Sequence, residues 1–453
     1  MTATLSGPTV AGPRLAQRTW TPTYVLFLVY LFTIVTGRLP VGTYAMILAL
    51  SSLIVQREPL RVPSFVWLFA AWFAWDVLGY GVTRYPDLVW DALVNHGKVL
   101  LVALLAANAL RTGAQIRFFI VFVLMSYVLF PARSTFVNYV HGYTLFGRAV
   151  GPFIYGNPND LAAHSILLLG PALALWASAR HGGPFRWIGL GGAGLLTVLI
   201  LLTQSRGAFL ALGTMAMPST LALIRRRPRA VLAVVAFLGT ALYFAPKSFW
   251  ARMQGLSKAT SVATIGQMDP EGSARQRFTV LQTAKRIIED HPVLGVGLGA
   301  YEVAQYHYNP SLGYLDTHNT YLNVLAETGL PGLVLFLAIV INVLRTVSEA
   351  RRRIGHVLPA QAEMLRWLQY ALSGYLIAAV FGSFAKLAFL YVYLALLWCA
   401  ARAAYLQDLP VGQSEPLLQR DQLPIAPEPL HGWGSMSPQA PGPPASPRPG
   451  SPA

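Results

Sequence analysis

The chain has 453 residues, of which 55% are apolar and only 11% are charged. Soluble domains carry about 25% charged residues, so the composition excludes an ordinary soluble protein and indicates a membrane protein. The net charge of +16 would suit a nucleic-acid-binding protein. However, the positive residues form short clusters between apolar runs, as membrane topology signals do, and we therefore exclude nucleic-acid binding. The single cysteine, Cys399, excludes an intrachain disulfide and a cysteine-based metal site.

Apolar runs long enough to cross a bilayer as helices recur along the chain. They predict an all-α integral membrane protein with about twelve transmembrane helices. The runs lie near residues 22–37, 40–56, 64–82, 98–110, 116–131, 160–179, 187–205, 207–224, 230–246, 319–344, 367–385 and 387–404.

The positions of Lys and Arg between these runs set the predicted orientation. Most of those outside the long polar loop fall on one side, which places both termini in the cytoplasm and that loop outside. The proline-rich tail cannot bury a core, and we expect it to be disordered. The predicted layout is a cytoplasmic segment 1–20, helices one to nine in 21–246, an outer loop 247–317 with substrate-site residues, helices ten to twelve in 318–404, and a cytoplasmic tail 405–453.

The outer loop contains a predicted amphipathic helix, residues 274–290, which ends before a glycine-rich turn at 295–301. Arg275 and Arg277 lie at its start. Charges on such a helix usually form a solvated face, but cations at a helix N-terminus oppose the helix dipole. An anionic partner such as a lipid diphosphate would offset that charge.

Arg206 stands between the seventh and eighth apolar runs, where only Arg206 and Gly207 separate the two helices. This spacing predicts a tight hairpin on the outer side. An arginine there either extends to the lipid head groups or binds an anionic substrate, since its planar fork suits phosphate. The residue alone does not separate these alternatives.

His318 and Asn319 stand where the outer loop ends and the tenth apolar run begins. Gly329, Pro331 and Gly332 are predicted to break or kink that run. A histidine at the mouth of a hydrophobic span is costly to bury unless something uses it. It is either an interfacial residue bonded to its own loop or part of a functional site.

Residues 156–160, GNPND, predict a turn into the sixth span, with Asn159 or Asp160 as the helix N-cap. Asn157 and Asn159 are also candidates for contacts to sugar hydroxyls. The tyrosines of the outer loop, Tyr301 among them, either anchor the protein at the interface or stack on sugars.

Two features concern acidic residues. Asp87 and Asp91 are spaced to share a helix face and hold a cation, but Lys98 is equally placed to neutralise them. No other dense carboxylate cluster accompanies them, so a metal enzyme is the weaker interpretation. Asp76 lies inside the third span, where an ionisable group faces a partner or a cavity.

The spacing His318-Asn319, nine residues, Gly329-x-x-Gly332 resembles the signature of the bacterial O-antigen ligase family. That family shares a superfamily with O-antigen polymerases and O-linked protein oligosaccharyltransferases. Three further stretches are similar to the superfamily, namely residues 151–160, 205–212 and 274–299. The His motif and the HPVLGVG run are more specific for the superfamily than for its ligase branch.

The resemblance implies a GT-C-like membrane fold in the bacterial inner membrane, with a site that faces the periplasm. It implies transfer of a preassembled glycan from undecaprenyl diphosphate to the lipid A–core oligosaccharide, with inversion and without a metal or cofactor. By motif, Arg206 and one of Arg275 or Arg277 bind the diphosphate, and His318 acts on the acceptor hydroxyl. The residues expected to contact substrate are Asn319, Asn157, Asn159, Arg148 and Tyr301.

Three alternatives remain open. An O-antigen polymerase uses the same donor, although polymerases tend to have two large outer loops and this chain has one. A protein O-oligosaccharyltransferase would be expected to carry an added periplasmic domain rather than a cytoplasmic proline-rich tail. A secondary transporter would show internal repeats with helices broken at mid-membrane, whereas here the polar residues gather at one membrane face.

Overall fold

The computed structural model describes residues 20–55, 59–180, 182–226 and 273–408, with a few positions between 232 and 250. The first helices are α1 (Pro22–Thr36), α2 (Gly42–Val55), α3 (Ser64–Tyr80), α4 (Pro86–Ala109), α5 (Gly113–Tyr127), the π-helical turn η1 (Val128–Ala132) and α6 (Arg133–Val140). There follow the strands β1 (Thr144–Leu145) and β2 (Arg148–Ala149), the 3-10 turn η2 (Phe153–Tyr155), α7 (Pro158–Ser178), α8 (Pro184–Leu202) and α9 (Arg206–Arg226). The C-terminal part holds α12 (Ser273–Asp290), α13 (Tyr301–Tyr308), η4 (Pro310–Leu312), α14 (Thr320–Ile354), α15 (Pro359–Ala378), η5 (Ala379–Phe381) and α16 (Ala388–Asp408).

Every predicted apolar run within the described residues overlaps a helix, but the run at 116–131 continues into η1, that at 367–385 continues past α15 through η5, and that at 187–205 ends in the turn after α8. The run at 98–110 is the second half of the longer helix α4, whose first turns are more polar. The predicted run 230–246 and most of the two terminal segments lie outside the described residues. Of the described helices, six are long and apolar enough to cross a membrane, and α1, α2 and α3 are shorter apolar helices. The chain is therefore an all-α, multi-pass membrane protein.

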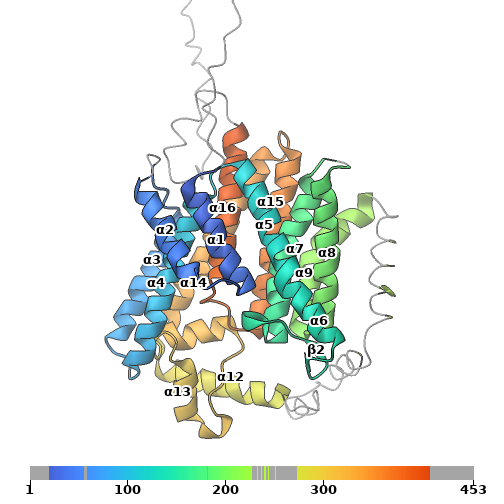
Figure 1. Ribbon diagram of the computed structural model, residues 1–453. Helices are drawn as coiled ribbons and strands as arrows, with labels where there is room; N and C mark the ends of the chain where they lie inside the picture. Colours follow the sequence, from blue (N-terminus) through green and yellow to red (C-terminus); the bar gives the residue numbers. More distant parts are fainter. Residues whose placement is uncertain are drawn as a thin grey trace, which may run out of the picture.

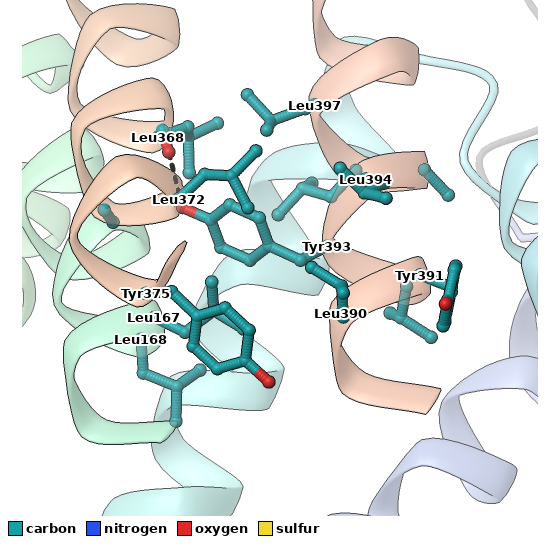
Figure 2. Close-up of a cluster of buried hydrophobic side chains, with 14 of the residues drawn as sticks. Leu167, Leu168, Leu368, Leu372, Tyr375, Leu390, Tyr391, Tyr393, Leu394 and Leu397 are labelled. Atoms are coloured by element: carbon teal, nitrogen blue, oxygen red, sulfur yellow. Dashed lines mark hydrogen bonds between the residues drawn. The ribbon is translucent and has the colours of Figure 1, made fainter. Parts of the chain in front are cut away.

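The helices pack into a bundle in which α7 contacts α8 and α15, and α14 contacts α3 and α16 (Figure 1). Figure 2 shows leucines of α7, α15 and α16 packed around the rings of Tyr375 and Tyr393. Buried tyrosine hydroxyls as a rule find a hydrogen-bond partner. The Tyr393 hydroxyl donates to the Leu368 carbonyl at 2.9 Å, so α16 is tied to α15 inside the apolar core.

The helices α12 and α13 lie across one end of the bundle, which we call the loop face (Figure 1). The predicted helix at 274–290 is confirmed as α12. Its apolar side, including Ile287, is buried in a second core with Val89 and Leu93 from the first turns of α4. Because α4 extends into this core, burial of apolar surface attaches the loop to the bundle.

The predicted break in the tenth run is confirmed at Gly329, where φ is 68° and ψ is −174° inside α14. The chain from the glycine-rich turn crosses α14 at this break, and backbone hydrogen bonds join the two segments. We call residues 292–297 and 326–330 the backbone crossing. Its bonds run from Val296 N to Ala326 O, from Gly297 N to Glu327 O and from Leu330 N to Pro292 O, each at 2.9 Å.

Candidate active site at the loop face

His318 directly precedes the N-cap of α14 and has a left-handed backbone, with φ of 49°. A residue other than glycine is strained in this region, so its surroundings must hold it there. The Asn319 side chain accepts from Tyr321 N at 3.0 Å and from Leu322 N at 3.1 Å, which caps α14. The backbone N–H of Asn319 donates to the Thr317 hydroxyl at 3.2 Å. These bonds fix the backbone next to His318 at the loop face.

Three effects act on the basicity of His318. Burial lowers the pKa of this imidazole below its usual value of 6.5, the Asp316 carboxylate raises it, and the Arg277 guanidinium lowers it. The net shift is downward, so the ring is neutral near neutral pH. The structure thus brings residues from α12 and from the loop before α14 together around one imidazole.

The two candidate arginines of α12 differ in their surroundings. Arg277 is half-buried and acts electrostatically on His318, whereas Arg275 is exposed. They lie two positions apart, and such neighbours face different sides of a helix. Of the two, Arg277 is therefore the arginine whose charge acts on the histidine.

Arg206 is the first residue of α9, so the prediction that Arg206 and Gly207 form the tip of the hairpin is wrong. The turn consists of residues 203–205. Gln204 adopts a positive φ of 50°, and its side-chain amide donates to the Gly147 carbonyl at 2.9 Å. The turn comes earlier than the apolar pattern suggested because this bond to the β1–β2 hairpin fixes Gln204. Arg206 itself is half-buried.

The short segment Phe381–Gly382 contacts both the start of α9 and the start of α14. Gly207 packs so closely against the Phe381 ring that an added Cβ would overlap it. The carbonyl of Gly382, the residue after Phe381, accepts a hydrogen bond from the Thr320 hydroxyl at 2.6 Å. The segments that carry Arg206 and His318 therefore contact two consecutive residues at the end of η5.

Arg148 and Asn159 join three elements next to Arg206. Arg148 donates to the Thr203 carbonyl and to the Asn159 side-chain oxygen, both at 2.9 Å. The same Asn159 oxygen accepts from the Ser205 hydroxyl at 2.8 Å. β2, the first turn of α7 and the α8–α9 turn are thereby held together.

The N-cap of α7 is Asn157, and the prediction of Asn159 or Asp160 as the cap is wrong. Pro158 takes the first helical position, which suits its fixed φ and its missing N–H. The cap therefore falls one residue before the proline, and the Asn157 side chain accepts from Asn159 N at 2.8 Å.

Tyr301 lies in the second core with none of its surface exposed. Its hydroxyl donates to the Val280 carbonyl of α12 at 3.4 Å. A ring with no exposed surface cannot stack on a sugar or anchor at an interface. Tyr301 packs α13 onto α12 and is not a substrate contact in this structure.

The sequence analysis did not single out an ion pair next to the site. Lys386 Nζ lies 2.9 Å from both carboxylate oxygens of Glu327, which is almost fully buried. The Asn323 amide lies 3.4 Å from a Glu327 oxygen and 3.4 Å from an Asp316 oxygen. Polar contacts therefore run from Lys386 to the carboxylate that acts on His318. The available signal was a lysine alone between two apolar runs.

The partner expected for Asp76 is His96 on α4, with Asp76 Oδ2 and His96 Nδ1 2.9 Å apart and both side chains buried. Asp87 and Asp91 are exposed on the first turns of α4, and Lys98 donates to Asn95 at 3.3 Å. Within the described residues, no three His, Cys, Asp or Glu side chains are grouped so that they would hold a metal ion.

The fold and the site define a class: a multi-pass helical membrane protein with a neutral imidazole at one end of its bundle, on which the charge of an arginine acts. Residues 191–337 match the family model described as O-Antigen ligase, and this segment contains Arg206, Arg277 and His318. Over this part of the chain, the match supports the resemblance to the O-antigen ligase family that the motifs predicted. The matched family is glycosyltransferase-like, and the match supports an activity broadly of the O-antigen ligase or polymerase type. A comparison with curated proteins found no match.

Proposed function

We propose that this protein is an O-antigen ligase of the bacterial inner membrane. It transfers a preassembled glycan from undecaprenyl diphosphate to a sugar of the lipid A–core oligosaccharide on the periplasmic face. The observation that carries the proposal is His318 at the start of α14, an imidazole on which the charges of Asp316 and Arg277 both act, within the segment that matches the family.

In the proposed reaction, His318 accepts the proton of the acceptor hydroxyl as that oxygen attacks the anomeric carbon of the donor glycan. The bond from this carbon to the diphosphate oxygen breaks, and the undecaprenyl diphosphate leaves with the electron pair. A single displacement of this kind inverts the anomeric centre. The reaction needs neither nucleotide hydrolysis nor a cofactor, because the donor already carries a good leaving group.

Arg206 and Arg277 are the proposed diphosphate-binding residues, since planar guanidinium groups bind phosphate oxygens with two hydrogen bonds. Fixed cations at this position stabilise the charge that develops on the leaving group. A bound diphosphate would also neutralise Arg277, which lowers the pKa of His318. Donor binding would therefore raise the basicity of His318 when the proton must be taken.

Asp316 has the opposite electrostatic effect on His318. In the proposal, its carboxylate stabilises the imidazolium that forms as the proton is transferred. Four residues expected to contact substrate hold the loop and the α8–α9 turn in place: Asn319, Asn157, Asn159 and Arg148. We propose that their main role is to position the site and that contact with sugars is secondary. The fold proposed for the whole chain is GT-C-like with twelve spans, cytoplasmic termini and the layout given above.

The first test uses a strain that lacks the gene, with its lipopolysaccharide resolved on a gel and its lipid-linked glycan extracted in parallel. A ligase predicts that long chains disappear from lipopolysaccharide and accumulate on undecaprenyl diphosphate. Lipopolysaccharide capped with one repeat would identify a polymerase instead. An unchanged ladder would exclude both activities.

The second test restores the gene with His318→Ala or Arg206→Ala. Loss of a general base reduces the rate by about 10²–10⁴-fold, so His318→Ala should restore no long chains within the growth of a culture. The matched control is His141→Ala, which changes an exposed histidine at the end of α6. Full transfer by a correctly inserted His318→Ala protein would rule out the proposed base.

A further inference from the structure

A cavity of about 440 Å³ lies at the loop face. This volume is within the roughly 300–1,000 Å³ range of small-molecule sites. It opens between the α3–α4 connection and the chain that links α12 to α13. The polar and aromatic side chains that line it are Thr83, Arg84, Tyr85, His291, His307 and Tyr308.

Helix α13 separates this cavity from the segment that leads to His318. Ala304, His307 and Tyr308 face the cavity. On its other side, Gln305 accepts from Leu315 N at 3.0 Å, and the ring of Tyr306 stacks on that of Tyr314 at 4.6 Å. The cavity and the proposed reaction centre are therefore two sites on either side of one short helix.

Among the residues that line the cavity, the cation Arg84 favours an anion as ligand. Arg84 is exposed and forms no ion pair with a carboxylate in the described residues. Its charge acts on the hydroxyls of Tyr85 and Tyr308. Asp290, which lies beside the cavity, accepts a hydrogen bond of 2.6 Å from the Tyr308 hydroxyl. His291 and His307 add two further hydrogen-bond donors or acceptors.

The aromatic side chains of the cavity favour a ligand with a sugar ring. Tyr85 and His307 stack with their centroids 5.9 Å apart and their planes at 15°. Tyr85 comes from the α3–α4 connection and His307 from α13, so two separate chain segments build this wall. Flat rings beside a cation form a surface that suits a sugar carrying a negative group.

We propose that this cavity binds an anionic sugar, one that carries a phosphate or a carboxylate, with Arg84 as its counter-ion and Tyr85 and His307 as its wall. Naming the source of that sugar rests on the proposed function. It belongs either to the core oligosaccharide of the acceptor or to the donor glycan. In both cases a saccharide chain extends past α13 while its reacting end lies at His318.

The binding test uses the full-length protein in lipid nanodiscs and core oligosaccharide released from lipopolysaccharide by mild acid. Arg84→Gln should weaken binding at least tenfold, and Tyr85→Leu should also weaken it. Arg38→Gln is the matched control, because it removes an exposed arginine from a different connection, α1–α2. A neutral maltooligosaccharide should bind no better to the wild type than to Arg84→Gln. Equal binding of the core oligosaccharide by wild type and Arg84→Gln, or an equal loss in Arg38→Gln, would refute the acceptor assignment.

The transfer test distinguishes the two sources. A higher KM for the lipid A–core acceptor in Arg84→Gln, with the KM for the donor unchanged, assigns the cavity to the acceptor; the reverse assigns it to the donor glycan. If neither KM changes and binding is also unchanged, the cavity proposal fails while transfer by the wild type still supports the ligase. If the wild type transfers no glycan, the proposed function fails, and the binding test alone decides on the cavity.

Discussion

Lys386 in the α15–α16 connection and Glu327 in α14 form an ion pair that joins these two segments. The lysine nitrogen is 2.9 Å from each carboxylate oxygen. The Glu327 side chain is 3% exposed and that of Lys386 is 37% exposed. Water can therefore solvate the lysine charge without the pair, whereas the buried carboxylate needs the lysine to offset its charge. Glu327 also belongs to the backbone crossing, where its carbonyl accepts from Gly297 N.

Lys386→Met should therefore destabilise the protein by about 3 kcal/mol, because it leaves a buried carboxylate unpaired. The double variant Lys386→Met/Glu327→Leu should recover most of that loss, since no charge is then buried. Thermal unfolding in detergent measures both. Arg366→Met, which breaks an exposed pair with Glu363, is the control and should cost less than about 1 kcal/mol. A double variant as unstable as Lys386→Met would contradict the role of the pair.

Gly329→Ala should destabilise the protein by more than about 3 kcal/mol. Its φ of 68° and ψ of −174° strain any side chain, and an added Cβ would overlap the Val293 carbonyl in the backbone crossing. Gly194→Ala is the matched control, because that glycine lies inside α8 with open space around its Cβ position. We expect it to change stability by no more than about 1 kcal/mol. Thermal unfolding of the two variants should separate them clearly.

The pH dependence of transfer should follow the charges around His318. The base must be neutral, so kcat/KM falls as pH drops through a pKa below the usual 6.5. Arg277→Gln removes a nearby cation and should move this acidic limb to higher pH. Asp316→Asn removes a nearby anion and should move it to lower pH.

The control for this pH experiment is Arg286→Gln, which changes an exposed arginine on the same helix and should leave the profile in place. The shifts are read from the residual activity of each variant, because Arg277→Gln also weakens the proposed binding of the diphosphate. Two shifts in the same direction, or none, would show that His318 does not set the acidic limb.

Asn159→Ala should lower stability by about 2 kcal/mol, since the Arg148 and Ser205 donors lose a shared acceptor. It should also slow transfer, because these bonds hold the turn that ends at Arg206. Asn95→Ala is the control: its side chain accepts one exposed bond from Lys98 at 3.3 Å. Unfolding and transfer measured on the same preparations test both effects. If the Asn159→Ala protein were destabilised but transferred glycan at the normal rate, the hydrogen bonds of Asn159 would matter for stability and not for the position of Arg206.

The helices followed from local pattern, because an apolar run of sufficient length has few structures other than a helix. The break at Gly329 was also readable, as three helix-disfavouring residues stand close together. The cap at Asn157 was missed although its signal was present: Pro158 marks the first helical position and so identifies the residue before it. Correct use of that rule would have given the cap.

The partners of buried polar groups were not readable from the sequence. His96 and Asp76 lie on different helices, and Lys386 is far along the chain from Glu327. Only packing brings such residues together, and no periodicity encodes it. Tyr301 was assigned to the surface because it stood in a tyrosine-rich loop, but the core between α12 and α4 buries it. The helix geometry and the electrostatic effect of Arg277 on His318 distinguish Arg277 from Arg275.

The backbone crossing implies that the chain can be cut and still behave as one protein. The turn η4 (Pro310–Leu312) lies in the chain between the two segments of the backbone crossing, residues 292–297 and 326–330. Pro310 and Ser311 in this turn are exposed. A protease that cleaves there would leave two fragments joined by the main-chain bonds at Ala326, Glu327 and Pro292 and by the packed helices. Such a nicked protein would run as two bands under denaturing conditions and as one particle in mild detergent. The two fragments are therefore natural halves for a split, reconstitutable form of the protein.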